Sequence, residues 1–147
     1  MELSKDAIKL YLRSSCRGNP GPGGWGIVVE VDDELQQYSG NIANTTNNRM
    51  EVTAAIEALA LLPPKTSAHL FTTSDYLFQG ATKWIHGWRK RNWTKRNGQP
   101  VANSDLWQLL DQRMPNYAIQ WVNAKGQALE GLEIAGKLAA AAAKDFA

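Results

Sequence analysis

The sequence has few or none of several features that each define a class of protein. It holds one cysteine, Cys16, among 147 residues, which excludes an internal disulfide and suits a reducing compartment. No apolar run is long enough to span a bilayer, and the N-terminal residues lack the apolar core of a signal peptide. We therefore expect a cytoplasmic protein without membrane attachment.

The chain also carries almost no net charge. The formal charge at pH 7 is only +2, so affinity for nucleic acid has to come from a local patch. Hydrophobic residues make up 44% of the chain and charged residues 20%, as in ordinary globular proteins. The length predicts one domain over residues 1–147 with a sizeable core.

What is present centres on Asn44–Glu51, a polar segment that leads into a helix. Thr46 or Asn47 can cap this helix, which we expect to run to about Leu62. Its apolar positions are dense enough for burial on most of its circumference. A carboxylate in its first turns, Glu51, is costly to desolvate without a cation nearby. The group that lies opposite Glu51 is therefore the central question.

Strand and helix patterns alternate along the rest of the chain. Strands are expected at 8–13, 25–31, 34–40, 68–73 and 118–122, and helices at 47–62, 74–88, 103–114 and 132–146. This order predicts an α/β fold: a mixed five-stranded sheet, three antiparallel strands then two parallel, flanked by helices. The glycine-rich segment 18–24 is expected to be a turn, either a plain connection or a backbone that approaches a ligand.

Four motifs together resemble bacterial-type ribonuclease H (type 1). They are Cys16–Gly24, Thr46–Glu51, Trp84–Trp88 and Asp105–Trp107, in matching order and with matching approximate spacing. The resemblance implies the ribonuclease H-like fold, which agrees with the sheet expected above. It also implies an endonuclease that hydrolyses the RNA strand of RNA/DNA hybrids with two Mg²⁺ (or Mn²⁺) ions held by four carboxylates.

Carried over position by position, that carboxylate site is degenerate. Arg13 stands where the family's Thr-Asp-Gly-Ser pattern has aspartate, and Thr73 stands at the aspartate of its Thr-Asp-Ser pattern. Gly136 matches the carboxylate of the terminal helix, and Gln127 matches the loop histidine. Only Glu51 of the four carboxylates survives, so we expect no metal, no cofactor and no hydrolase activity, as in a pseudoenzyme with its magnesium site lost.

Electrostatics supports this expectation. Magnesium needs oxygen ligands, and two close ions need clustered negative charge, whereas Arg13 is a permanent cation. We expect Arg13 to pair with Glu51; in the alternative, it swings into solvent and Glu51 is hydrated. Asp75 is expected to point elsewhere. Glu130 and Glu133 flank the start of the terminal helix, and even if one of them reached the cleft, two acids would be too few.

Residues expected to hold nucleic acid are better preserved. A basic stretch carries Lys83, Arg89, Lys90, Arg91, Lys95 and Arg96, with Trp84, Trp88 and Trp93 interleaved. Such a patch is typical of salt-dependent phosphate contact. A solvated face and core packing of the tryptophans are the alternatives. The resemblance implies a basic protrusion that grips the DNA strand.

Further positions match the family's two strand-binding tracks. Asn19, Thr46 and Arg49 match a pocket for a DNA phosphate, and Cys16, Asn47 and Asn48 match positions near the RNA strand. Helix capping by Thr46 or Asn47 is compatible with these roles.

Three functions are consistent with these patterns. The first is a catalytically inactive ribonuclease H-like protein that binds RNA/DNA hybrid or duplex nucleic acid. The second is a protein-interaction scaffold that binds no nucleic acid. The third is a residual metal-dependent ribonuclease with an altered site.

Overall fold

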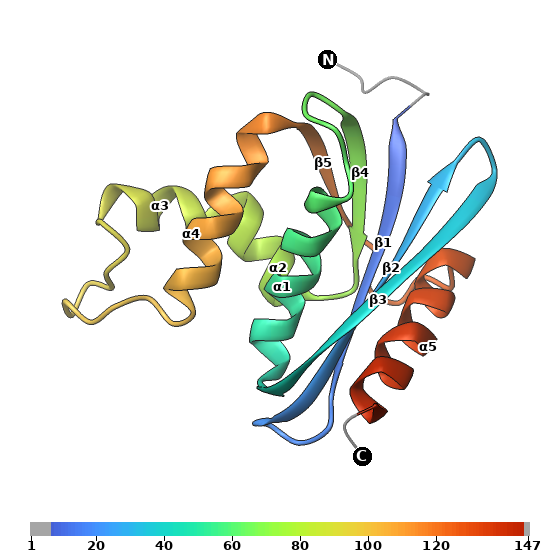
Figure 1. Cartoon of the computed structure of the whole chain (residues 1–147). Coiled ribbons are helices and arrows are strands. Elements are labelled where there is room, and N and C mark those ends of the chain that lie inside the picture. The colour runs from blue at the N-terminus through green and yellow to red at the C-terminus, as the bar shows by residue number, and fades with distance from the viewer. Residues whose placement is uncertain (1–6, 146–147) are drawn as a thin grey trace.

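The structure is a computed structural model that describes residues 7–145 (Figure 1). The strands are β1 (Ile8–Cys16), β2 (Gly21–Val31), β3 (Glu34–Thr45), β4 (Ser67–Thr72) and β5 (Ala118–Asn123). The α-helices are α1 (Asn47–Ala60), α2 (Asp75–Gln79), α3 (Ile85–Lys90), α4 (Ser104–Arg113) and α5 (Glu130–Lys144). A π-helical turn, Gly80–Trp84, joins α2 to α3, and a short 3₁₀ turn, Met114–Asn116, follows α4.

The strands form one sheet in the order β3-β2-β1-β4-β5. Strand β2 pairs antiparallel with β1 and β3, whereas β4 pairs parallel with β1 and β5. The predicted mixed sheet is confirmed. Strands β1 and β3 run further than expected, to Cys16 and Thr45, so both reach the end of the sheet at which α1 begins.

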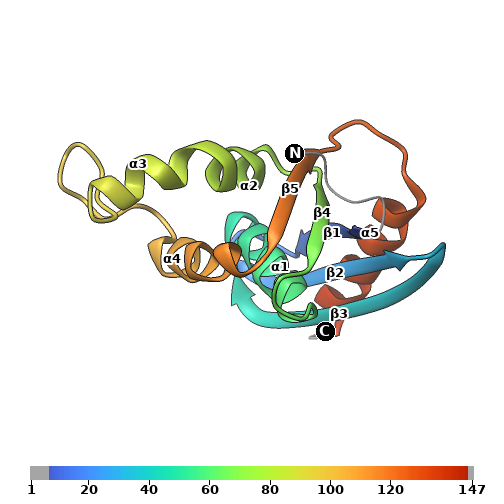
Figure 2. The ribbon, with the colours of Figure 1, turned by 90° about the horizontal axis from the view of Figure 1, so that it is seen from above.

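Helices cover the two faces of the sheet unequally. Helix α1 packs on β1 and β2 from one side, and α5 packs on β1, β2 and β3 from the other (Figure 2). The larger hydrophobic cluster lies on the α1 side and includes Trp107 of α4, and the smaller one lies beneath α5. No helix within residues 7–145 is long and apolar enough to cross a membrane.

The glycine-rich segment differs from the prediction. Gly21–Gly24 belong to β2, and only the residues just before them form the turn. A Cβ on Gly24 would overlap the carbonyl oxygen of Ala139 in α5, and one on Gly26 would overlap that of Ala135. Gly24 and Gly26 therefore serve the close approach of helix to strand rather than a loop.

The helical region after β4 extends away from the sheet. Helix α2, the π turn and α3 follow one another without a break and lead to the chain that protrudes at the left of Figure 1. A Cβ on Gly80 would overlap the ring of Trp107, so the glycine that begins the π turn lets this tryptophan pack against it. The predicted helix to Trp88 thus continues to Lys90 in three pieces.

Candidate functional site

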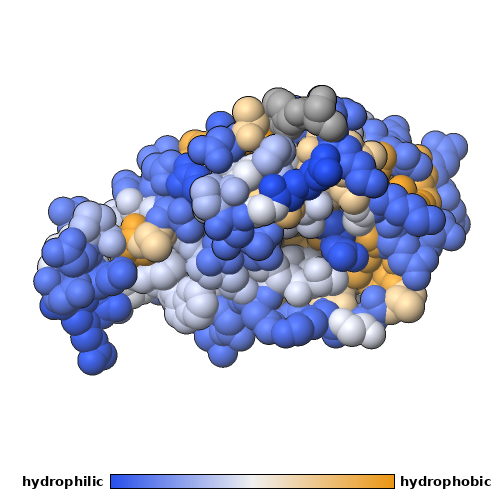
Figure 3. Space-filling model, turned by 90° about the horizontal axis from the view of Figure 1, so that it is seen from below, coloured by the Kyte–Doolittle hydropathy of each residue, from blue (hydrophilic) through white to orange (hydrophobic). Residues whose placement is uncertain are grey.

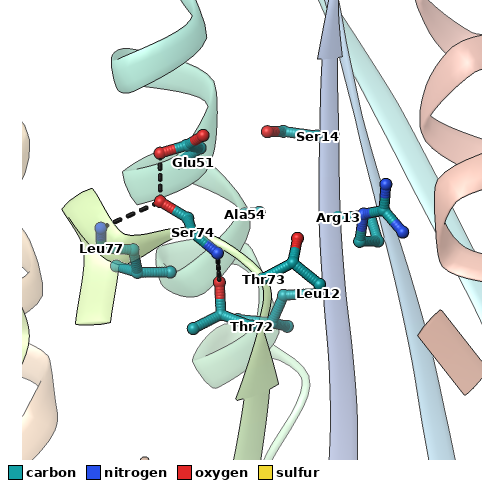
Figure 4. Close-up of a pocket in the computed structure, with 9 residues that line it drawn as sticks. All are labelled: Leu12, Arg13, Ser14, Glu51, Ala54, Thr72, Thr73, Ser74 and Leu77. Carbon is teal, nitrogen blue, oxygen red and sulfur yellow. Dashed lines mark hydrogen bonds between the residues drawn. The ribbon is translucent and has the colours of Figure 1, made fainter. Parts of the chain in front are cut away.

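A cleft opens where β1 continues beyond β4. The last pair between these strands is Leu12 with Thr72, whereas β1 remains paired with β2 up to Cys16 and Gly23. The chain leaves the sheet after Thr72 and enters α2. In open α/β sheets, ligands bind in such a crevice beyond the carboxyl ends of the strands. The cavity measures about 200 Å³ and is lined by Leu12, Arg13, Ser14, Glu51, Ala54, Thr72, Thr73, Ser74 and Leu77 (Figure 4).

Glu51 reaches this cavity from α1 and is held by a serine. Ser74 Oγ donates a short hydrogen bond to Glu51 Oε2 and accepts one from the backbone N–H of Leu77 at 3.0 Å. Burial raises the pKa of Glu51, and the Ser74 bond opposes this only in part. Ser74 is the N-cap of α2, but its bond to Glu51 was not predicted from the sequence because it depends on the packing of α1 against α2.

The predicted ion pair between Arg13 and Glu51 is wrong. Arg13 points away from Glu51 and toward α5, whereas Ser14 points to the Glu51 side (Figure 4). The reason is the two-residue period of a strand, which places neighbouring side chains on opposite faces. Arg13 Nη1 donates a long hydrogen bond of 3.4 Å to the carbonyl of Leu132.

Arg13 and Gly136, two of the degenerate positions, are neighbours. A Cβ on Gly136 would lie 3.3 Å from Arg13 Nη1, so the absent side chain of the glycine leaves the room that the guanidinium occupies. Thr73, the third degenerate position, lies in the cavity between Glu51 and Arg13 in the view of Figure 4. The structure therefore brings all the degenerate positions to one place.

The other acids are engaged or distant. Asp75 does not line the cavity, as expected; it accepts hydrogen bonds from Asn123 at 3.0 Å and Lys125 at 2.8 Å. These bonds, that of Lys125 first, lower the pKa of Asp75. Glu130 and Glu133, in the first turn of α5, are exposed and do not line the cavity either. Gln127, at the predicted histidine position, is exposed in the loop before α5.

A second cavity, of about 410 Å³, lies at the start of α1. Its lining is formed by Asn19, Thr46, Asn47, Asn48 and Asn103, all with uncharged polar side chains. Thr46 is the N-cap, as predicted, and its Oγ1 accepts from the backbone N–H of Arg49 at 3.2 Å. The Asn19 side chain accepts from the N–H of Asn47 at 3.1 Å, which ties the turn before β2 to this helix end.

Arg49 does not line this second cavity, because its guanidinium is already paired. It donates to both carboxylate oxygens of Asp105, at 3.0 and 2.8 Å, and to Asn103 Oδ1 at 3.2 Å. The Arg49 bond holds the pKa of Asp105 below its usual range. The Asn103 amide donates in turn to the Tyr76 hydroxyl at 3.0 Å.

Asn103 is the residue of this cavity that the sequence analysis missed as a site residue. The sequence placed it only at the start of a predicted helix. It is the N-cap position of α4, but its side chain makes no capping bond. Its backbone is left-handed, with φ 60° and ψ 28°. Asparagine tolerates that conformation better than most residues, and this is the local signal that was available.

Cys16 lies away from both cavities. Its thiol is half-buried and faces backbone carbonyls, those of Gly21 at 3.7 Å and Thr45 at 3.6 Å. Asn47 and Asn48, predicted with it near the RNA strand, are exposed beside the second cavity. The three positions thus lie at the same end of the sheet, but only the two asparagines face a cavity.

The basic residues form a protrusion built on an aromatic cluster. Lys83, Arg89, Lys90, Arg91, Lys95 and Arg96 are all exposed. Of these, Arg89 is paired with Asp111. Seen from the end at which α1 begins, the protrusion is the hydrophilic lobe at the left of Figure 3.

Tryptophan packing supports this protrusion from below. Trp88 contacts Trp84, Trp93 and Trp107, with ring centroids 5.9, 6.4 and 5.3 Å apart. Trp107 is fully buried, whereas Trp84 is 41% exposed. Core packing therefore accounts for Trp88 and Trp93, and Trp84 presents much of its ring to solvent.

Comparison with known proteins agrees with this architecture. The RNase H family model matches residues 5–144. The chain belongs to the ribonuclease H family. The ribonuclease H of Rickettsia felis is 46% identical over 121 residues, which cover 82% of this chain and 80% of that protein. The ribonuclease H of Rickettsia canadensis is 46% identical over 134 residues, which cover 90% and 86%.

Solved structures of this family share the fold. LC9-RNase H1, described as a type 1 RNase H with the type 2 active-site motif, matches with a TM-score of 0.84 and 29% identity. The match covers 100% of this ribonuclease H-like chain and 76% of LC9-RNase H1. LC11-RNase H1, solved in complex with an RNA/DNA hybrid, is 20% identical with a TM-score of 0.60, over 94% and 97% of the two chains.

Proposed function

We propose that this ribonuclease H-like protein binds RNA/DNA hybrid or duplex nucleic acid without cleaving it. The observation that carries the proposal is the composition of the cleft: Glu51 is the only carboxylate among the nine residues that line it, and one of the nine is an arginine. Membership of the ribonuclease H family suggests nucleic acid as the ligand, whereas the composition of the cleft argues against hydrolysis of it.

The donor set of the cleft does not suit the metal ions of the family. Magnesium favours carboxylate, carbonyl and water oxygens, and two neighbouring ions need several negative charges to offset their repulsion. Here Glu51 already accepts the Ser74 hydroxyl, and Ser14 and Thr73 contribute only neutral hydroxyls. Within residues 7–145, no group of three or more acidic, histidine or cysteine side chains is placed to hold a metal. We therefore derive no reaction step through a metal.

Binding has separate support from surfaces outside the cleft. The exposed basic side chains of the protrusion provide the local positive patch that the small net charge alone does not. The second cavity adds amide and hydroxyl groups beside the first turn of α1, where backbone N–H groups favour anions. Asn48 and Glu51 are three residues apart on α1, so this cavity and the cleft are neighbours along one helix face.

The test is a hybrid assay that scores bound and cut substrate together, in Mg²⁺ and in Mn²⁺. The unaltered chain should bind and not cut. A triple variant, Arg13→Asp with Thr73→Asp and Gly136→Asp, restores carboxylates beside Glu51 and should gain metal-dependent cleavage. The matched control replaces the same three positions by asparagine, which has the shape of aspartate without the charge, and should stay inactive.

Three results would contradict the proposal. Cleavage by the unaltered chain that disappears in Glu51→Gln would show that this carboxylate works with acids discounted above. An aspartate triple variant that folds, binds hybrid and stays inactive would show that the missing carboxylates are not what prevents cleavage. Neither binding nor cleavage by the unaltered chain would favour a protein-interaction scaffold instead.

A further inference from the structure

Arg13 is a cation at the edge of the cleft with few partners. The only hydrogen bond of its side chain within residues 7–145 is the long one to the Leu132 carbonyl. The ion pairs in that part of the chain are Arg49–Asp105, Arg89–Asp111 and Lys125–Asp75, and none includes Arg13. A guanidinium has five N–H donors in a planar fork and stays charged at every relevant pH. Most of the donors of Arg13 therefore remain available to a ligand.

Hydroxyl donors line the same cavity, on the other side of β1 from this guanidinium. Ser14 and Thr73 both line it, and in the view of Figure 4 their hydroxyls lie between Glu51 and Arg13. The hydrogen bonds drawn there join Ser74 to its neighbours, but none joins Ser14 or Thr73 to another lining residue. A permanent cation and free hydroxyls at the two sides of one cleft are donors for an oxyanion, whereas a metal site needs acceptors.

The single acid of the cleft is placed to interfere little. Glu51 lies on the α1 side, across the cavity from Arg13, and Ser74 donates to its carboxylate. The neighbouring second cavity and the basic protrusion both suit a polyanion, which favours a phosphodiester backbone over a small carboxylate.

We propose that Arg13, with the hydroxyls of Ser14 and Thr73, makes the cleft an anion site that holds one backbone phosphate of the bound nucleic acid without metal. This inference rests on the proposed binding of hybrid and adds the contact by which the altered cleft takes part in it. Gly136 belongs to the site because a Cβ at that position would lie only 3.3 Å from Arg13 Nη1. Hybrid binding should accordingly need no divalent ion.

The experiment measures hybrid affinity in a chelator at fixed salt for matched variants. Arg13→Ala should weaken binding about tenfold, the size expected for one charge-assisted contact. Lys9→Ala removes one positive charge from the same strand, about 13 Å away at the rise of a β-strand, and should change affinity less than about twofold. Glu51→Gln should strengthen binding about two- to threefold, because it removes a negative charge close to the bound phosphate. A metal-holding role for Glu51 predicts the opposite sign when Mg²⁺ is present.

A second readout follows Arg13 directly. Its Nε–H signal in an NMR spectrum, assigned by its loss in Arg13→Lys, should shift when hybrid is added and also, more weakly, with inorganic phosphate. A shift with inorganic phosphate but not with hybrid would assign the site to a free phosphate or nucleotide and overturn the backbone contact.

The remaining outcomes separate this inference from the function on which it rests. If Arg13→Ala binds hybrid normally while reversal of the protrusion's charges abolishes binding, the inference fails and the proposed function stands. If the unaltered chain binds no hybrid, the proposed function fails and the backbone contact with it. An Arg13 signal that moves with neither ligand overturns the anion site altogether.

Discussion

The cleft beyond β4 and the surface around the start of α1 differ in how their side chains are held. In the cleft, Arg13 makes one long hydrogen bond and Gly136 contributes no side chain. At the start of α1, Thr46 caps the helix and Arg49 binds both oxygens of Asp105. The cleft has lost the residues that the ribonuclease H pattern predicts, and the surface has kept them.

The difference follows from what each residue does for the fold. Clustered carboxylates repel one another, so replacing them removes activity without removing a stabilising contact, and it can even stabilise. A cap such as Thr46 or a buried ring such as Trp107 stabilises the folded chain whether or not a ligand is present. Residues with this double role cannot change freely. On the proposed function, this explains why the residues of the binding surface are kept while the carboxylates are replaced.

The largest effect should come from reversing the protrusion. Lys90→Glu, Arg91→Glu and Lys95→Glu together should weaken hybrid binding about 100-fold and reduce the salt slope by about three, since each lost phosphate contact lowers the slope by about one. Binding measured at several salt concentrations checks both values. An unchanged slope would mean that nucleic acid binds elsewhere than on the protrusion, and it would contradict the comparison drawn above.

Next in size is the loss of the buried ring beneath the protrusion. Trp107→Ala should lower the free energy of unfolding by about 3–5 kcal/mol, because a fully buried tryptophan leaves a large cavity. It also removes the 3.0 Å bond that the indole N–H donates to Tyr76. Denaturant unfolding measures the change. Trp84→Ala, at a 41% exposed position, is the control and should cost clearly less.

Loss of the α1 cap should act on stability and binding together. Thr46→Ala should cost about 1 kcal/mol, the usual value of a helix cap, and should also weaken hybrid binding through the second cavity. Thr46→Ser keeps the capping oxygen and should restore both. If Thr46→Ala lowers stability but leaves affinity unchanged, the cap has no part in binding and the double role argued above fails at this residue.

The smallest effect should come from Glu51 in the cleft. Unlike the variants above, its substitution should raise the stability of the chain. Burial raises the pKa of Glu51 in the folded chain above its ordinary value of 4.5. Protonated Glu51 therefore favours the folded state, and this contribution to stability is complete below pH 4.5 and is lost as pH rises through the folded pKa. Glu51→Gln should therefore unfold at a higher temperature than the unaltered chain at neutral pH, and this gain should vanish below pH 4.5. Thermal unfolding across pH measures it. A loss of stability at neutral pH would mean that the charge of Glu51 is stabilised by the cleft.

Local sequence determined the elements and their order. The period-2 strands, a cap at Thr46 or Asn47 and the burial of the helix that carries Glu51 were all predictable, because each depends on neighbours within a few residues. The mixed sheet followed from their order. The motifs also allowed the degenerate positions Arg13, Thr73 and Gly136 to be predicted as one group.

Tertiary structure alone decided which side chains meet. A strand sends adjacent side chains to opposite faces, so whether Arg13 or Ser14 faces Glu51 depends on the orientation of β1 in the sheet, which no local pattern fixes. The Ser74–Glu51 bond joins residues 23 apart in sequence, and the Arg49–Asp105 pair joins residues 56 apart. Gly24 was predicted to lie in a turn, and only the packing of α5 against β2 shows why a glycine stands there. Such contacts depend on the packing of distant elements, and that packing turned Arg13 away from Glu51 and into the space that Gly136 leaves open.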